Sequence, residues 1–351
     1  MKTKNTACPK LFIGIDIHKA SWSVRLATDL FQGKRFTSPS DPELLLQFVK
    51  KNYPEYEVHC AYEAGCCGYA AHRAFESYGW HSIVFNPADI SRTGKSQYQK
   101  TDGIDADLIC RELKDQRLVG ITVPDIEREH LRCLFRRRND LVKDIRQIKS
   151  QIKGQLLYLG IKLPDEFDNA NWTKSFRSWI NELQFQNLTV KAAMASRLSH
   201  FEFLDSSVRQ VSNELRKYCR THYKKDYRLL RSVPGIGGIV ACGILSELGD
   251  LRRFGNFKQL ASYVGLMPSV CQSGESTRSS GMNPRGNGII RSYFVEASWQ
   301  ALRFDPVMQA YYRTHSGKDS KAILVKIARK LLSRTMAVIK TETPYTCGVL
   351  Q

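Results

Sequence analysis

Near residue 120 the hydrophobic pattern of this 351-residue chain changes from strands mixed with helices to one long helix. Before that point Ile13, Ile15 and Ile17 alternate with other residues, which is the period of a β-strand. After it, leucines and isoleucines recur every three or four residues from about 127 to 159, as in a coiled-coil seam. A chain of this length is expected to hold two or three domains. We predict three parts, residues 1–120, 121–225 and 226–351.

The first part is predicted to be an α/β domain. Its apolar segments indicate strands first, and then helices and strands in alternation. Asp41 precedes a helix that opens at Pro42 and is a suitable N-cap. The strands are predicted at residues 11–17, 22–27 (continuing toward Phe36), 57–64 and 80–85, and a further helix at 102–113.

The other two parts are predicted to be mainly helical. The long helix at 127–159 is followed by a helical region to about 223, interrupted near 169–171. A glycine-rich turn at 234–238 then precedes an apolar helix, and the stretch from 269 to 287 has the composition of a loop. Two more helices are predicted, at 289–302 and 321–340.

The balance of charge points to a polyanionic partner. The chain has 53 lysines and arginines against 34 acidic residues, a formal net charge of +19. Such an excess favours nucleic acid over a membrane surface. A basic face that serves only solubility is the alternative.

The cysteines and the hydropathy favour a cytoplasmic protein. The ten cysteines are scattered, and no Cys-x-x-Cys pair occurs, so we expect reduced thiols rather than a disulfide framework or a zinc site. The first residues lack the apolar stretch of a signal peptide, and no run approaches the ~18 apolar residues of a membrane helix.

Four carboxylates of the first part could bind a divalent cation. Asp16 lies in an apolar strand, where a charge is costly unless it is paired or metal-bound, and Glu63 ends another strand. Asp102 and Asp105 are three residues apart, which places them on one side of a helix. Mg²⁺ prefers such oxygen ligands when phosphates complete its coordination. Alternatively, each acid has a structural role, such as a hydrogen-bonded strand aspartate or a helix cap.

The glycine-rich turn could bind phosphate. Gly235 and Gly237 lie just before a predicted helix, where backbone N–H groups and the helix dipole favour an anion. Turns of this composition also occur where elements pack closely, so a purely structural role stays open.

Five motifs in order resemble one family. The segments Ile-Gly-Ile-Asp16-Ile-His-Lys, Tyr62-Glu63-Ala64 and Lys100-Thr-Asp102-Gly-Ile-Asp105-Ala are similar to the three acidic motifs of DEDD-type insertion-sequence transposases, relatives of the pilin-gene invertases. Val233-Pro-Gly-Ile-Gly and the region from Gly265-Leu-Met-Pro268 to Arg291 resemble that family's C-terminal transposase region.

The resemblance implies an RNase H-like first domain, a helical coiled-coil middle and a mainly α C-terminal transposase domain. It implies Mg²⁺ bound by a catalytic tetrad, here Asp16, Glu63, Asp102 and Asp105. It also implies a serine that attacks DNA and stays covalently linked to the cut strand; by position this is Ser273. The rival serines of the same stretch are Ser269, Ser276, Ser279 and Ser280.

Basic residues near this serine are candidates to contact DNA. Arg278, Arg285 and Arg291 could neutralise the scissile phosphate. The chain departs from many relatives in having Gln272 before Ser273, and Asn283-Pro284 where others are more basic. Gln272 puts the register of the serine in doubt.

The resemblance further implies double-stranded donor and target DNA, a non-coding bridge RNA that selects them, and a homo-oligomer, either dimer or tetramer. In such an assembly one subunit's metal domain would work with another's serine. The seam at 131–159 offers a dimerisation device. The alternatives are a metal-dependent nuclease or junction resolvase without serine chemistry, and a non-catalytic nucleic-acid scaffold.

Overall fold

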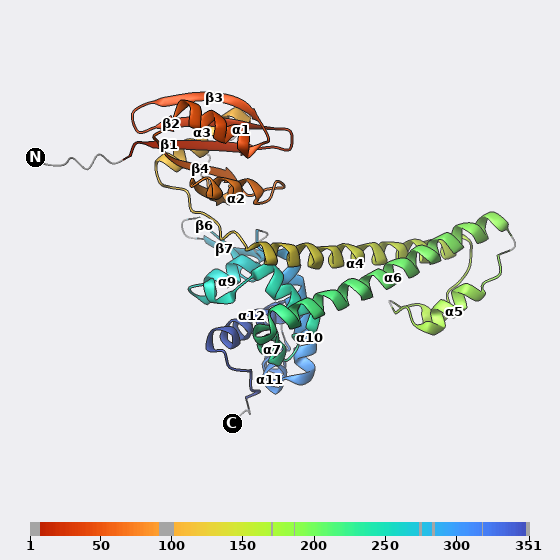
Figure 1. Cartoon of the computed structure of the whole chain (residues 1–351). Helices are drawn as coiled ribbons and strands as arrows, with labels where there is room; N and C mark the ends of the chain where they lie inside the picture. The colour runs from red at the N-terminus through yellow and green to blue at the C-terminus, as the bar shows by residue number, and fades with distance from the viewer. Residues whose placement is uncertain are drawn as a thin grey trace, which may run out of the picture. The chain divides into compact units, whose positions relative to one another are not determined.

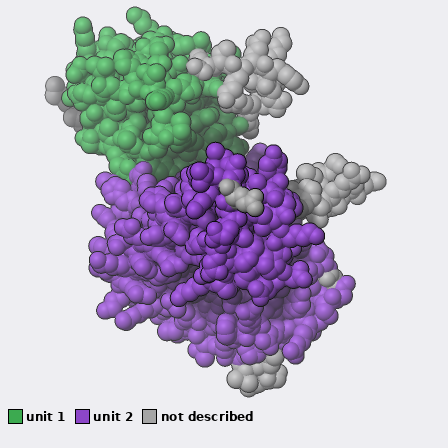
Figure 2. Space-filling model, turned by 90° about the vertical axis from the view of Figure 1, so that its right-hand side faces the viewer, with its two compact units in different colours: residues 1–123 green, residues 124–351 purple. Residues whose placement is uncertain are grey.

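The computed structural model of the chain describes residues 8–90, 102–169, 171–185, 187–273, 276–282, 285–317 and 319–348. It divides into two units, Met1–Val123 and Pro124–Gln351, which Figure 2 colours separately. The predicted boundary near residue 225 is not tested by this division and stays a prediction.

In the first unit the described strands form one five-stranded mixed sheet, in the order β3-β2-β1-β4-β5 (Figure 1). β1 is antiparallel to β2 and parallel to β4, while β2–β3 is antiparallel and β4–β5 parallel. This sheet confirms the predicted α/β, RNase H-like fold. Its strands are β1 (Lys10–Ile17), β2 (Ser21–Thr28), β3 (Gln32–Pro39), β4 (Glu57–Glu63) and β5 (His81–Phe85).

Helices cover both faces of this sheet. Side chains of α1 (Pro42–Asn52) and α2 (Ala70–Ser77) share a core with the β1 residues Ile13 and Ile15. α3 (Asp102–Lys114) packs on the opposite face, where its apolar residues meet Phe12. The side chain of Asp41 accepts from the N–H of Glu43 at 2.8 Å, as predicted for the N-cap of α1. A short 3₁₀ turn, η1 (Pro87–Asp89), follows β5.

Gly14 lets the backbone of α3 contact the backbone of β1. A Cβ at Gly14 would lie 2.4 Å from both the carbonyl oxygen of Ala106 and the nitrogen of Cys110. Both atoms belong to the helix backbone, which cannot rotate away as a flexible side chain can. The spacing of α3 from the sheet therefore depends on glycine at this position.

The second unit begins with two long helices that run side by side (Figure 1). They are α4 (Ile126–Tyr158) and α6 (Leu188–His222), with η3 (Asp165–Phe167) and α5 (Lys174–Glu182) between them in sequence. Leu141, Ile148 and Ile152 of α4 are buried against Met194 and Phe201 of α6. The long helix predicted from the heptad pattern is thus confirmed.

The buried residues of this seam pack against α6 of the same chain, so they are not free to form the predicted dimer interface. Ile152 and Leu156 are fully buried within one chain. Arg138, which interrupts the apolar pattern, donates to the hydroxyl oxygens of Ser212 on α6 (3.0 Å) and of Tyr293 (2.6 Å). These buried residues form a contact inside one subunit, and the homo-oligomer stays a prediction.

The rest of the second unit packs around a separate apolar core. The helical elements around this core are α7 (Lys224–Ser232), α8 (Gly238–Gly243), η4 (Ile244–Leu248), η5 (Leu251–Arg253), α9 (Phe257–Val264), α10 (Gly288–Phe304), α11 (Pro306–Thr314) and α12 (Ser320–Thr341). The predicted apolar helix after the glycine turn is α8 continued by η4, which has π-helical hydrogen bonding.

The stretch from 269 to 287, predicted as a loop, contains a β-hairpin instead. β6 (Pro268–Ser273) and β7 (Ser276–Met282) pair antiparallel in a two-stranded sheet. Cross-strand backbone bonding overrides a composition poor in strand formers.

None of the described helices combines the length and apolarity needed to cross a membrane.

Replacing Gly14 by alanine should separate α3 from the sheet. We expect the free energy of opening of β1, measured by hydrogen exchange of its amides, to fall by ~2–3 kcal/mol, as for an overpacked core. The control is Gly154→Ala on α4, where a Cβ meets nothing within 4 Å. That change should stabilise α4 slightly, by ~0.5–1 kcal/mol. Equal behaviour of the two variants would contradict the close approach at Gly14.

Truncating the seam should destabilise the single chain rather than dissociate an assembly. Ile152→Ala removes a fully buried side chain and should lower the free energy of unfolding in urea by ~2–4 kcal/mol. Leu157→Ala, at a side chain that is 79% exposed, is the matched control and should change little. A dissociated assembly with unchanged stability would restore the dimer interpretation of the seam.

Candidate active site

Two of the predicted carboxylates lie at the carboxyl ends of adjacent parallel strands. Ile15 of β1 pairs with Tyr62 of β4, so Asp16 and Glu63 are the next residues on each strand. Side chains alternate between the faces of a sheet. Ile15 and Tyr62 face the core under α1 and α2, and Asp16 and Glu63 therefore face the side covered by α3. Both carboxylates are half-buried.

The contacts of α3 show that it runs antiparallel to β1. Near its C-terminus, Lys114 Nζ donates to the carbonyl oxygen of Thr28, which pairs with Leu11 at the start of β1. One turn earlier, Cys110 Sγ lies 3.5 Å from the carbonyl oxygen of Phe12. The N-terminal turn of α3 therefore lies toward the carboxyl end of β1.

This turn brings the second pair of acids to the same face. Asp105 is 8% exposed and directly precedes Ala106. The backbone of Ala106 contacts Gly14, which lies two residues before Asp16 on β1. Asp102 is the first residue of α3 and lies three residues before Asp105, on the same side of the helix. The side chain of Asp102 lies outside the described part of the chain. Asp16 and Glu63 thus lie on the face of the sheet that α3 covers, and Asp105 lies near the start of that helix.

His18 is a residue of this site that the sequence analysis did not assign. Its Nε2 lies 3.2 Å from Oδ2 of Asp16, and its side chain is 49% exposed against 14% for Asp16. The signal in the sequence was its place two residues after Asp16, directly beyond the end of β1. The imidazole can orient the Asp16 carboxylate from the solvent side.

Asp107, also on α3, belongs to a different arrangement. Arg35 Nε donates to Asp107 Oδ1 at 3.2 Å, and Arg25 Nε lies 3.5 Å from the same oxygen. These arginines come from β3 and β2, so Asp107 is committed to ion pairs away from Asp16 and Glu63. This agrees with leaving Asp107 out of the predicted tetrad.

Tyr62 fixes the connection that follows Glu63. Its buried hydroxyl donates to the carbonyl oxygen of Gly68 at 3.1 Å and accepts from the N–H of His72 at 3.2 Å. Burial raises the pKa of Tyr62 to about 12, so its hydroxyl stays protonated as a donor at neutral pH. The chain leaving the acidic site is therefore held against the start of α2.

The donor set at this face fits a hard divalent cation. Its described members offer carboxylate oxygens from two strand ends and one helix, which is the ligand type that Mg²⁺ binds beside phosphates. Three acids on one face would repel each other without a cation or basic partner. The segment 91–101, which precedes α3, lies outside the described residues.

The predicted nucleophile lies in the second unit, at the end of a strand. Ser273 is the last residue of β6 and pairs with Ser276, the first residue of β7. Arg278 pairs with Cys271 further along the same hairpin. The side chains of Ser273 and Arg278, and the turn residue Gly274, lie outside the described residues. The backbone thus places Ser273 beside the turn of a hairpin.

Contacts to the backbone hold the two segments at the base of this hairpin together. A Cβ at Gly286 would lie 2.3 Å from the Cα of Gly265, so the segments entering β6 and leaving β7 touch. Arg329 on α12 donates to the carbonyl oxygen of Leu266 at 2.9 Å. Arg291 Nη1 lies 3.5 Å from the carbonyl oxygen of Gly265, whereas Arg285 is exposed.

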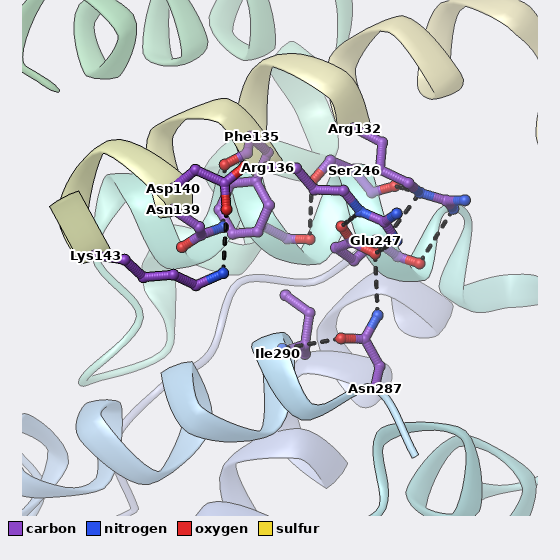
Figure 3. A network of polar contacts seen from close by, with 11 residues as sticks. Arg132, Phe135, Arg136, Asn139, Asp140, Lys143, Ser246, Glu247, Asn287 and Ile290 are labelled. Carbon is purple, nitrogen blue, oxygen red and sulfur yellow. Dashed lines mark hydrogen bonds and ion pairs between the residues drawn. The ribbon is translucent and has the colours of Figure 1, made fainter. Parts of the chain in front are cut away.

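A buried carboxylate supports the same base (Figure 3). Glu247 in η4 is 1% exposed, and Arg136 on α4 donates to it from Nε at 2.8 Å and from Nη2 at 3.1 Å. Asn287 Nδ2 also donates to Glu247, at 3.0 Å, and Asn287 Oδ1 caps α10 through the N–H of Ile290. Glu247 therefore links α4 to the residue that leads from β7 into α10.

The glycine turn before α8 shows a packing role at one position. Gly235 has φ +90°, and a Cβ there would lie 2.5 Å from the carbonyl oxygen of Ala297 on α10. A Cβ at Gly237 would meet nothing within 4 Å. Gly235 is thus required by the contact with α10, and phosphate binding by this turn stays a prediction.

Both halves of the candidate site fall in regions that match transposase family models. Residues 13–160 match a transposase model of the DEDD type of IS110, and residues 227–313 match the model of the transposase IS116/IS110/IS902 family. The first region contains all four acids and the second contains Ser273, Arg278, Arg285 and Arg291.

Whole-chain comparisons agree with these matches. The pilin gene-inverting protein of Moraxella bovis is 27% identical over 348 residues, which cover 96% of this chain and 98% of that protein. The putative transposase y4qE of Sinorhizobium fredii is 28% identical over 302 residues, covering 84% and 72%. The transposase for insertion sequence element IS1533 of Leptospira borgpetersenii is 26% identical over 252 residues, covering 70% and 72%.

Neutralising Glu247 should destabilise the second unit. Glu247→Gln removes the charge that faces Arg136, and we expect the free energy of unfolding to fall by ~2–4 kcal/mol, somewhat less than for a fully buried pair since Arg136 is half exposed. Asp140→Asn, which breaks the exposed pair with Lys143, is the control and should cost at most ~0.5 kcal/mol. Similar losses in urea unfolding for both variants would refute a special role for Glu247.

Proposed function

The chain belongs to the IS116/IS110/IS902 transposase family with a DEDD-type first domain, and from this we propose that it cuts and rejoins DNA through a serine–phosphate link assisted by Mg²⁺. As a transposase it is a DNA-binding enzyme of phosphoryl transfer. The observation that carries the proposal is the placement of Asp16 and Glu63 at adjacent strand ends, on the face of the RNase H-like sheet that α3 covers, with Asp105 near the start of that helix.

In this proposal the four acids form the cation site. Asp16 and Glu63 supply oxygens from fixed strand ends, and Asp102 and Asp105 supply them from the first turn of α3. Mg²⁺, when bound there, would neutralise charge on the scissile phosphate and stabilise the leaving oxygen. His18 keeps the Asp16 carboxylate oriented through its 3.2 Å contact.

Ser273 is the proposed nucleophile. Its Oγ forms a bond to the scissile phosphorus while the bond to a sugar oxygen breaks, and that oxygen leaves as a hydroxyl. The serine proton passes to a base, as nucleophilic hydroxyls require. A sugar hydroxyl of the partner strand then attacks the phosphoserine and releases Ser273, so the phosphodiester count is conserved. The fastened hairpin base supports such a role, because a nucleophile must be held in place.

The acids and the serine lie in different units, so the proposed site needs both, from one chain or from two. We propose a homo-oligomer, a dimer or a tetramer, in which subunits share sites. We also propose the three-part division, with Arg278, Arg285 and Arg291 contacting DNA phosphates. We propose that a bridge RNA recognises the donor and target sequences by base pairing. The protein would then mainly contact the phosphate backbones of the nucleic acids, which suits its net charge of +19.

A second candidate function is a metal-dependent nuclease or junction resolvase. It is favoured by the fact that the three described acids, Asp16, Glu63 and Asp105, all belong to the first unit. In that case water would be the nucleophile, and the hairpin would only bind DNA.

Ser273→Ala distinguishes the two functions. We expect it to abolish the covalent protein–DNA adduct and strand exchange while DNA affinity stays within ~3-fold, because only one hydroxyl is removed. Adducts are measured on trapped substrate by denaturing gel and by mass spectrometry of the modified peptide. Asp16→Asn should also abolish cleavage, by weakening cation binding.

The matched controls are Ser269→Ala and Ser279→Ala in the same hairpin, which should leave the adduct intact. Cleavage retained in Ser273→Ala without any adduct would favour the nuclease. An adduct mapped to another serine would show that this other serine, and not Ser273, is the nucleophile. Recombination retained in Asp16→Asn would contradict the proposed cation site.

A further inference from the structure

Two histidines and a glutamate gather at the end of β4 that lies away from the candidate active site. Glu57 Oε1 is 3.0 Å from Nε2 of His59, two residues along β4. The same oxygen is 3.1 Å from Nε2 of His81, the residue of edge strand β5 that pairs with His59. The two imidazole rings are stacked, with centroids 4.7 Å apart.

The three residues share one face of the sheet. Glu57 and His59 are two apart on β4, and His81 lies directly across from His59, so all three side chains point the same way. Glu57 is the first residue of β4 and Glu63 the last. At ~3.3 Å per residue the cluster lies about 20 Å from the acidic site. It is therefore a separate site.

The spacing of the donor atoms is close to that of a metal centre. All three ligand atoms lie within 4.8 Å of one another. In a tetrahedral Zn²⁺ site with bonds of ~2.0–2.1 Å, neighbouring ligand atoms are about 3.3–3.4 Å apart. The observed separations of 3.0 and 3.1 Å need only a small expansion to admit such an ion.

The chemistry of the donors selects the class of ion. Imidazole nitrogen with one carboxylate suits Zn²⁺ and other late divalent transition metals, whereas Mg²⁺ prefers oxygen alone. A histidine binds a metal ion through the lone pair of a ring nitrogen, which both imidazoles can offer here. The His81 side chain is 62% exposed, so an ion can enter from solvent.

We propose that Glu57, His59 and His81 bind Zn²⁺ or a similar late transition-metal ion that links β4 to the edge strand β5. Nε2 of each ring faces Glu57 Oε1. To bind the ion, each neutral ring offers the Nε2 lone pair and carries its single proton on Nδ1, so a change of tautomer releases no net proton. Lys10, the register partner of Glu57 on β1, places a positive charge beside this site and limits its affinity for a cation.

Zinc binding to the full-length protein without a polyhistidine tag tests this site. Protein stripped with a chelator is equilibrated with Zn²⁺ in excess Mg²⁺, and bound zinc is counted by mass spectrometry. The wild type should bind one equivalent more than His81→Ala, or bind it at least ~10-fold more tightly. Zinc should also slow hydrogen exchange of the His81–Phe85 amides in the wild type and not in the variant.

His200→Ala on α6, an exposed histidine outside the cluster, is the control and should match the wild type. Asp16→Asn should keep the extra equivalent, which separates this site from the acidic one. If circular dichroism shows that His81→Ala is misfolded, Glu57→Gln replaces it as the test. This substitution preserves the shape of the side chain and should weaken zinc binding. Equal zinc content in the wild type, His81→Ala and Glu57→Gln, with no change in exchange, would show a hydrogen-bonded cluster only and overturn the proposal.

Discussion

The contact between the backbones of α3 and β1 at Gly14 is the constraint on which the candidate active site depends. With no side chain between them, the helix lies close enough for Asp105 to face the sheet near Asp16. A helix pushed outward by even one methyl group would carry Asp102 and Asp105 away from the strand ends. The glycine thus allows the helix that begins with Asp102 and Asp105 to pack directly on the strand that carries Asp16.

The second unit uses a similar device with a different chemistry. Gly265 and Gly286 meet at the base of the hairpin that carries Ser273, and the buried Glu247 links that base to α4 through Arg136 and Asn287. A buried carboxylate that lost its partners would be strongly unfavourable, so the network favours one arrangement of the segment between β7 and α10. In the proposed function this matters because a nucleophile needs a fixed approach to phosphorus.

The first unit presents two sets of donors on one face of one sheet. Oxygen ligands lie at the carboxyl ends of β1 and β4, and an imidazole-rich set lies where β4 begins. The two sets differ in the ion they prefer, so one strand can serve two metals without competition. The late transition metal proposed for the second set would stabilise β5, which lies at one edge of the sheet formed by the described strands.

The sequence by itself determined the periods of the strands and helices, and hence the order of elements from β1 to α3 and the length of α4. Those features follow from local side-chain spacing, as does the pairing of Asp102 with Asp105 on one helix side. The sequence could not show that α6 covers the α4 seam, since a heptad pattern does not specify its partner. Nor could it show the β6–β7 hairpin, His18 beside Asp16, or His81 beside His59, because these contacts arise from strand pairing and register. Tertiary structure decided them, since residues far apart in the chain meet only once the backbone hydrogen bonds and close packing have fixed their positions.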